Sequence, residues 1–98
     1  MKNLYYILVD KGPVAISDLE EWNEFFESDG RRVDLTETPN GTVSTVFLGI
    51  DHQFGEGPSI LFETLISGGD YDFVMIRYHT WDDAKKRARY NCSQINRW

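Results

Sequence analysis

The chain has 98 residues, which is enough for one compact domain with a modest core and too few for two. Hydrophobic residues make up 41% of it, with six Phe, five Tyr and three Trp, and this composition excludes a disordered chain. A single cysteine excludes an internal disulfide, and a net charge of −6 argues against nucleic-acid binding through the whole surface.

The first elements are a strand and an amphipathic helix. Residues 4–10 are expected to form a buried strand, because aromatic and β-branched residues dominate them and Lys11-Gly12-Pro13 then ends the run. Ser17 and Glu20 have the spacing of a capping box, which starts a helix that Asp29-Gly30 ends. One side of this helix is apolar, with Leu19, Trp22, Phe25 and Phe26. The opposite side is acidic, with Glu20, Glu21, Glu24 and Glu27.

Four strands are expected in the middle of the chain. Residues 32–38 and 42–50 should pair, since Asn40-Gly41 between them is a strong hairpin signal. The second of these strands is apolar on both sides, so we expect it at the centre of the sheet. A loop at 51–58 follows, and then two further strands at 59–66 and 71–78, which a second hairpin at 67–70 joins.

Thr80 and Asp83 predict the start of a final helix, whose apolar stripe contains Trp81, Ala84, Ala88, Cys92 and Ile95. The element order is therefore strand, helix, four strands, helix. This order predicts a single α+β domain over residues 1–98, with a mainly antiparallel sheet of about five strands and both helices on one face.

Charge is distributed unevenly along the chain. Residues 1–70 hold 13 acidic and 4 basic residues, whereas residues 71–98 hold 3 acidic and 6 basic ones. We therefore expect a bipolar molecule whose acidic part binds a basic protein surface. The four glutamates of the first helix, Glu20, Glu21, Glu24 and Glu27, are the candidate partner-binding residues. They also have two other interpretations, which are mimicry of nucleic-acid phosphates and an ordinary solvated helix face.

A polar cluster follows the central strand at Asp51, His52 and Gln53. A carboxylate beside an imidazole can form an oriented base, but adjacent residues usually point apart, so hydrogen bonding to the loop backbone is the alternative. His79 lies just before the last helix. With Glu63 and Arg77, these residues are the candidate ligand pocket: Asp51, His52, Gln53, Glu63, Arg77 and His79.

Glu63 and Arg77 are charged residues inside two apolar strands. In the hairpin that closes near Asp70 they face each other, so we expect a cross-strand ion pair. The alternative places both on the open face of the sheet with Thr45, as the floor of a ligand or partner site.

No segment completes a catalytic or metal-binding pattern. His and Cys lack zinc-ligand spacing, Cys92 falls on an apolar helix stripe, and Ser44 and Ser59 lack the glycine-flanked elbow of a serine nucleophile. We therefore expect no catalytic residues, no metal and no cofactor. The apolar runs are too short for a membrane helix, and the absence of a signal-peptide pattern favours a cytoplasmic protein.

Several segments together resemble a family of small uncharacterised proteins encoded by bacteriophages and prophages. The most specific are TVFLGIDHQFG at 45–55, LFET at 61–64 and RYHTWDDA at 77–84. The likeness extends over nearly the whole chain, including the aromatic helix around Trp22 and Phe26. It implies a phage source and the cytoplasm of a host cell as the setting, but it implies no mechanism.

Small acidic phage proteins outside the virion often bind a host enzyme or defence complex. The leading hypothesis is therefore a non-catalytic protein–protein interaction module that binds a host or phage protein with a basic surface, with inhibition of a host enzyme or defence complex as its specific form. The alternative is a small-ligand binding protein, with a nucleotide as one candidate ligand, or a minimal enzyme with a pocket around Asp51, His52, Glu63 and Arg77. A third hypothesis is a self-associating structural subunit, in which the chain forms a homo-oligomer.

Overall fold

The computed structural model describes residues 4–69, 72 and 74–95, with side chains described up to Ala88 in the last helix. Its elements in chain order are β1 (Tyr6–Val9), β2 (Gly12–Ala15), α1 (Leu19–Phe26), a 3-10 turn η1 (Asp29–Arg31), β3 (Arg32–Thr38), β4 (Gly41–Phe47), β5 (Phe62–Ser67), β6 (Val74–Tyr78) and α2 (Trp81–Ile95). The predicted α+β class is confirmed. The single sheet of about five strands is wrong, because β3 to β6 form one sheet and β1 pairs with β2 in another.

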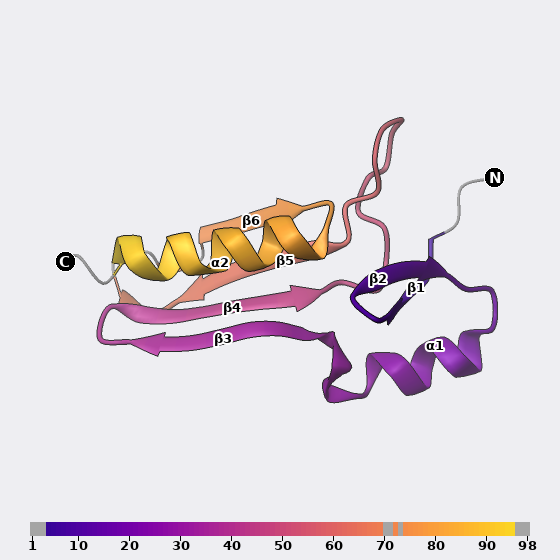
Figure 1. Ribbon diagram of the computed structural model, residues 1–98, viewed down its shortest axis with the longest axis horizontal. Helices are drawn as coiled ribbons and strands as arrows, with labels where there is room; N and C mark the ends of the chain where they lie inside the picture. Colours follow the sequence, from indigo (N-terminus) through magenta and orange to yellow (C-terminus); the bar gives the residue numbers. More distant parts are fainter. Residues whose placement is uncertain (1–3, 70–71, 73, 96–98) are drawn as a thin grey trace.

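The larger sheet has the strand order β3-β4-β5-β6, and every neighbouring pair is antiparallel. Both predicted hairpins, β3–β4 and β5–β6, are therefore confirmed. Phe47 lies opposite Phe62, and Thr45 opposite Thr64, and all four side chains are buried on the face that α2 covers. The Thr45 and Thr64 hydroxyls are 2.6 Å apart, so these two buried polar groups satisfy each other. Figure 1 shows α2 lying along this sheet.

The other face of the sheet carries a mixed row of side chains. Leu35, Ser44, Leu65 and Met75 lie opposite one another across β3 to β6. Leu35 is 43% exposed and Met75 is 52% exposed, so this face is open to solvent. The expectation of two helices on one face is wrong, because α1 makes its main contacts with η1 and β1 instead. The chain turns at η1 before it enters β3, which places α1 beyond the end of the sheet (Figure 1).

The β1–β2 hairpin is an element that the sequence did not predict beyond its first strand. Val9 pairs with Gly12, so the turn consists of Asp10 and Lys11 alone, with φ angles of 51° and 70°. Positive φ at both central positions is the geometry of a type I′ turn, and glycine or asparagine usually supplies it. The Lys11 ammonium lies 5.8 Å from the centre of the Trp81 ring, a cation–π contact between this turn and α2.

The start of α1 differs by one residue from the prediction. Asp18, rather than Ser17, is the N-cap, and its Oδ1 accepts hydrogen bonds from the backbone N–H groups of Glu20 at 3.0 Å and Glu21 at 3.3 Å. Carboxylates are as effective as hydroxyls at this position, and both neighbouring residues are able to cap a helix. The helix follows as expected but ends at Phe26, before η1.

β4 ends at Phe47 instead of Ile50, because Gly49 turns the chain. Gly49 has φ +75°, and its carbonyl accepts hydrogen bonds from the Tyr6 backbone at 2.9 Å and from Trp22 Nε1 at 2.9 Å. β5 then begins at Phe62, three residues later than predicted, so the connection between β4 and β5 is longer than the 51–58 loop. β6 begins at Val74, and residues 71 and 73 of the predicted strand, like residue 70 of the predicted turn, lie outside the described part of the chain.

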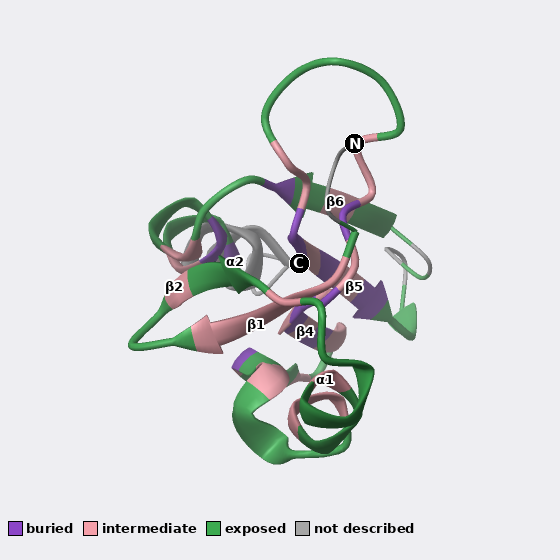
Figure 2. Ribbon diagram, turned by 90° about the vertical axis from the view of Figure 1, so that its right-hand side faces the viewer, coloured by how far each residue is buried: buried purple, intermediate pink, exposed green. Residues whose placement is uncertain are grey.

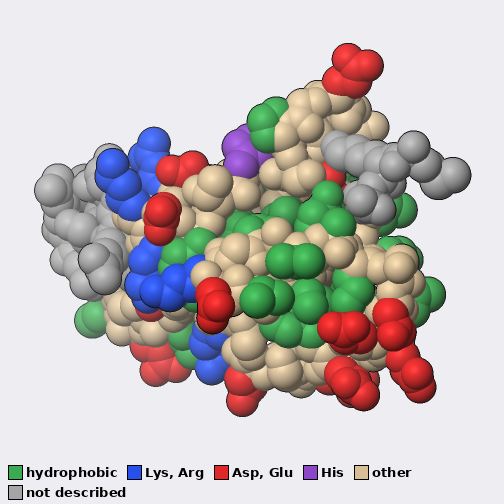
Figure 3. All heavy atoms as spheres, turned by 45° about the vertical axis from the view of Figure 1, so that its right-hand side comes forward, with side chains coloured by type: hydrophobic (Ala, Val, Ile, Leu, Met, Phe, Trp, Pro, Cys, Tyr) green, Lys and Arg blue, Asp and Glu red, His purple; other side chains and the backbone are tan. Residues whose placement is uncertain are grey.

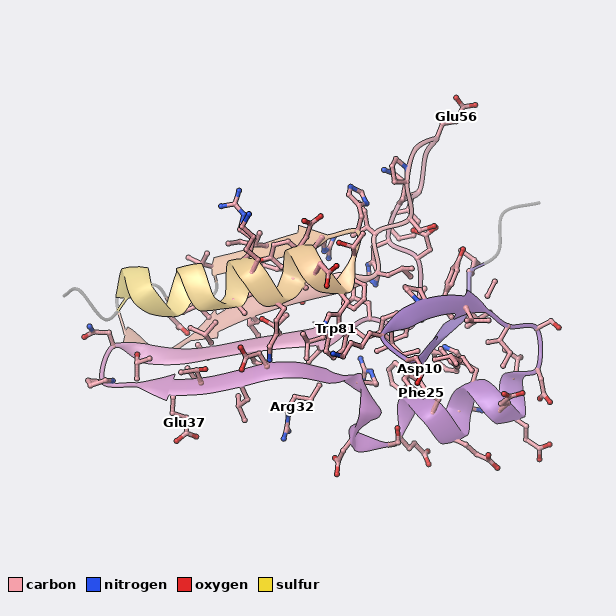
Figure 4. The ribbon with its side chains drawn as sticks, viewed as in Figure 1. Asp10, Phe25, Arg32, Glu37, Glu56 and Trp81 are labelled. Atoms are coloured by element: carbon pink, nitrogen blue, oxygen red, sulfur yellow. The ribbon has the colours of Figure 1, made fainter. Side chains whose placement is uncertain are left out.

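The core lies where the sheet, α2 and the N-terminal elements meet. Its buried cluster consists of Val33, Phe47, Leu61, Phe62, Tyr78 and Ala84. Tyr6 and Leu8 of β1, Phe25 of α1 and Trp81 of α2 pack against this cluster, and Figure 4 shows Phe25 and Trp81 at the junction. The predicted α2 stripe is confirmed at Ala84 and Ala88, which are both fully buried, while the Cys92 and Ile95 side chains lie outside the described part.

Candidate functional site

Asp51 braces the loop between β4 and β5. Its side chain is fully buried, and Oδ1 accepts hydrogen bonds from the backbone N–H groups of Gln53 at 2.7 Å and Ile60 at 3.0 Å. Its own N–H donates to the Leu4 carbonyl at 2.9 Å. A carboxylate used in this way fixes both ends of a loop, which is the structural alternative that the sequence left open for this residue.

The loop that Asp51 closes extends away from the body of the protein. Figure 2 shows it as an exposed arch, and Figure 4 shows Glu56 at its tip. The His52 backbone pairs with Ile60 at the base of the arch, at 3.0 Å. The His52 ring lies 5.9 Å from that of Phe54, whose side chain is 82% exposed. His52 and Asp51 therefore have separate surroundings and do not form an acid–base pair.

Glu63 and Arg77 form the predicted cross-strand ion pair. They lie opposite each other in β5 and β6, and Arg77 Nε is 3.1 Å from Glu63 Oε2. The side chains are 15% exposed for Glu63 and 41% exposed for Arg77, so the pair lies on the open face of the sheet and is not sealed inside the protein. Thr45, which the alternative reading placed beside them, is buried on the opposite face.

His79 lies at the end of β6 and is held by the loop. Its Nδ1 is 2.8 Å from the Ser59 carbonyl oxygen. Since a carbonyl only accepts hydrogen bonds, Nδ1 carries the proton in this contact and Nε2 remains available to other groups.

One cavity contains two of the six predicted ligand residues. It has a volume of about 390 Å³ and lies between β6 and α2, lined by Arg77, Tyr78, His79, Asp83, Lys86 and Arg87. Arg77 and His79 both border it from β6, although the Arg77 guanidinium itself pairs with Glu63 on the open face. Asp51, His52, Gln53 and Glu63 do not line it. The sequence missed the contribution of α2, although Asp83, Lys86 and Arg87 have the three- and four-residue spacing that places side chains on one helix face.

The four predicted partner-binding glutamates are all exposed, and they lie on α1 or, for Glu27, at its C-cap: Glu20, Glu21, Glu24 and Glu27. Figure 3 shows acidic side chains gathered at this end of the molecule. Within the described residues, none of the four carboxylates belongs to an ion pair. They are therefore a surface feature and have no structural role in the salt bridges of the fold.

The inner face of α1 attaches it firmly to the rest of the protein. Trp22 stacks on Phe26 with ring centres 4.6 Å apart and meets Tyr5 edge-on at 5.1 Å. The Arg31 guanidinium lies 3.7 Å from the centre of the Phe26 ring, and its Nε donates to the Phe47 carbonyl at 3.1 Å. Burial in this position lowers the pKa of Arg31 below its ordinary value.

Among the described residues, no group of three or more His, Cys, Asp or Glu side chains is arranged to hold a metal ion. In the same part of the chain, no helix combines the length and the apolar character needed to cross a membrane. Comparisons of the chain with protein-family models, with curated proteins and with solved structures found no match.

Proposed function

We propose that the protein is a non-catalytic protein–protein interaction module that binds a basic surface of its partner through the acidic face of α1. The observation that carries the proposal is the set of four exposed glutamates on a short, anchored helix. Opposite charge on a partner would speed the encounter and fix the orientation of the two proteins.

The anchoring of α1 supports this function energetically. An eight-residue helix is marginal by itself, so the aromatic contacts of Trp22 and Phe26 and the hydrogen bond to Gly49 hold it in place. Because the backbone under the glutamates is already ordered, this protein would lose little conformational entropy in α1 when a partner binds.

Apolar side chains near the glutamates would add to such a contact. Leu19 at the start of α1 is 52% exposed, and Val9 and Val14 of the β1–β2 hairpin are 51% and 45% exposed. In Figure 3 hydrophobic side chains lie next to the acidic ones. Protein interfaces typically combine a small apolar centre with a charged or polar rim, and this end of the molecule offers both.

The dispersal of the predicted pocket argues against the enzyme alternative. A minimal enzyme built on Asp51, His52 and Glu63 needs these groups to converge on one reacting atom. Asp51 instead binds loop backbone, His52 lies against Phe54, and Glu63 pairs with Arg77. The resemblance to phage proteins supplies the setting for the proposal, in which the partner is a host protein and its inhibition is the effect.

The test compares two variants of equal net charge. Changing Glu20, Glu21, Glu24 and Glu27 to Gln raises the formal charge from −6 to −2, and Glu37→Lys with Glu56→Lys raises it by the same amount. Glu37 and Glu56 are exposed residues outside α1. Each tagged protein captures partners from an extract of a bacterial host, and the captured protein is then purified for titration calorimetry.

We expect the wild type and the Glu37/Glu56 variant to bind the captured partner with similar affinity, and the α1 variant to lose at least tenfold. Binding of the wild type should also weaken as salt rises, because the contact depends on charge. Equal affinity of the α1 variant and the wild type, with both folded by circular dichroism, would refute the proposal.

A further inference from the structure

The cavity between β6 and α2 differs in character from the acidic end of the molecule. Lys86 and Arg87 from α2 bring two of the ten Lys and Arg residues of the chain to this cavity, together with His79 from the end of β6. Among the described residues that line the cavity, Asp83 is the only one with a carboxylate. Figure 3 shows Lys and Arg side chains gathered toward the α2 side, away from the acidic group over α1.

Two other basic side chains, those of Lys85 and Arg31, are held by structural contacts. Lys85 Nζ lies 3.3 Å from the Val33 carbonyl and 3.8 Å from Asp34, and Arg31 lies on Phe26. Lys86 is the next residue after Lys85 but is exposed and lines the cavity. Within the described residues no ion pair involves Lys86.

We propose that this cavity, which we name the β6–α2 cleft, binds a small organic phosphate. The Arg77 guanidinium is paired with Glu63 on the open face of the sheet, so the fork-shaped donor of the cleft is Arg87 of α2, which lines the cleft beside Lys86. Lys86 supplies a second positive charge, and the Nε2 atom of His79 is the ring nitrogen left for a ligand. A guanidinium offers a fork of N–H donors and an ammonium a compact point charge, and this combination suits a phosphate group.

The size and the single carboxylate of the cleft indicate the rest of the ligand. A volume of about 390 Å³ falls in the usual range of roughly 300–1,000 Å³ for small-molecule sites and exceeds what an inorganic phosphate needs. Asp83 would repel a bare anion but accepts hydrogen bonds from a hydroxyl or amino group. The ligand therefore combines a phosphate with such a donor, as a nucleoside monophosphate does. A net charge of −6 disfavours a long polyanion at the same place.

The experiment is an NMR titration of the ¹⁵N-labelled protein with adenosine 5′-monophosphate, inorganic phosphate, adenosine and a ten-residue oligothymidylate. We expect the monophosphate to shift the amide signals of residues 77–79 and 83–87, inorganic phosphate to shift the same signals more weakly, and adenosine to leave them unchanged. No shift with either phosphate up to about 10 mM would refute the proposal, because a dissociation constant weaker than that corresponds to a binding free energy of less than about 3 kcal/mol. An equal response to adenosine would refute the role of the phosphate, and tighter binding of the oligothymidylate would refute a small ligand.

Two neighbouring lysines give a matched pair of variants. Lys86→Gln removes a charge from the cleft, and Lys85→Gln removes the same charge from the next residue, whose side chain contacts β3. We expect Lys86→Gln to weaken binding of the monophosphate about tenfold, as loss of one charged hydrogen bond does, and Lys85→Gln to change it less than about threefold. Equal losses in the two variants would refute the cleft as the site. The α1 variant in which the four glutamates become Gln should bind the monophosphate like the wild type, so this test and that of the proposed function fail independently.

Discussion

The Asp51 carboxylate determines the shape of the long β4–β5 connection. It is fully buried, yet two backbone N–H groups from opposite ends of the loop donate to the same oxygen. Burial of a charged group is costly unless hydrogen bonds compensate, and here they also close a loop that has little apolar content of its own. The adjacent Asp51 and His52 looked from sequence like a candidate acid–base pair, and only the fold reveals that one is an internal brace and the other a surface ring.

We expect Asp51→Ala to lower the free energy of unfolding by about 2–3 kcal/mol, because two buried backbone donors lose their acceptor. Asp51→Asn keeps an oxygen at the same place and should cost clearly less. Urea unfolding of the two variants and the wild type measures the difference. If alanine and asparagine prove equally destabilising, the charge of Asp51 matters for stability and its role as a hydrogen-bond acceptor for the loop does not.

The attachment of α1 depends on the backbone at Gly49. A Cβ built there would lie 3.3 Å from Phe26 and 3.4 Å from Trp22 Nε1, and the left-handed φ of +75° adds backbone strain for any other residue. We expect Gly49→Ala to destabilise the protein by about 1–3 kcal/mol and to speed hydrogen exchange in α1. Gly55→Ala is the control, since its Cβ would meet no atom nearer than 3.8 Å, and it should leave both quantities nearly unchanged. Unaltered exchange in α1 of the Gly49 variant would show that the aromatic contacts alone hold the helix.

The β5–β6 hairpin carries the Glu63–Arg77 pair on its solvent-facing side. The residues of such partly exposed pairs interact weakly, because water screens the charges and two flexible side chains must be ordered. We expect a double-mutant cycle with Glu63→Gln and Arg77→Gln to give a coupling free energy below about 1 kcal/mol in thermal or urea unfolding. A much larger coupling would mean that the pair braces the sheet as a buried ion pair does.

Local signals predicted some elements well and others poorly. Turn residues between alternating strands were enough for both hairpins of the larger sheet, and the Glu63–Arg77 register followed from them. The strand Gly12–Ala15 was missed because it begins with two residues that disfavour strands, and its turn uses Asp10 and Lys11 where glycine is usual. Other features of the fold depend on contacts between residues far apart in the sequence. The place of α1 and the β6–α2 cleft both depend on how distant segments pack, which periodicity alone does not specify.

At the scale of the whole molecule, the two helices lie in different places and carry different charges. The protein measures 45 × 29 × 21 Å, with α1 beyond one end of the sheet and α2 along its length (Figure 1). Acidic side chains gather over α1 at one end, and Lys and Arg side chains lie toward α2, while other acidic residues such as Glu37 and Glu56 lie away from α1 (Figures 3 and 4). Like charges that crowd together repel one another and destabilise the fold. Removing acidic charges from α1 and measuring the free energy of unfolding therefore tests whether the fold itself needs these charges.

Glu24 and Glu27 are placed unfavourably for the stability of α1. Both lie in its last turn or at its C-cap, where the partial negative charge of the helix end repels carboxylates, and the helix has no basic residue there. Glu20 and Glu24 are also four residues apart, so their charges repel across one turn. We expect Glu24→Gln with Glu27→Gln to raise the free energy of unfolding by a few tenths of a kcal/mol in low salt, and the gain to shrink in 1 M NaCl, where screening removes the repulsion. Urea unfolding at the two ionic strengths measures it, with Glu37→Gln as a control outside the helix. A loss of stability on removing the two charges would mean that they serve the fold, and would weaken the case that they are kept for a partner.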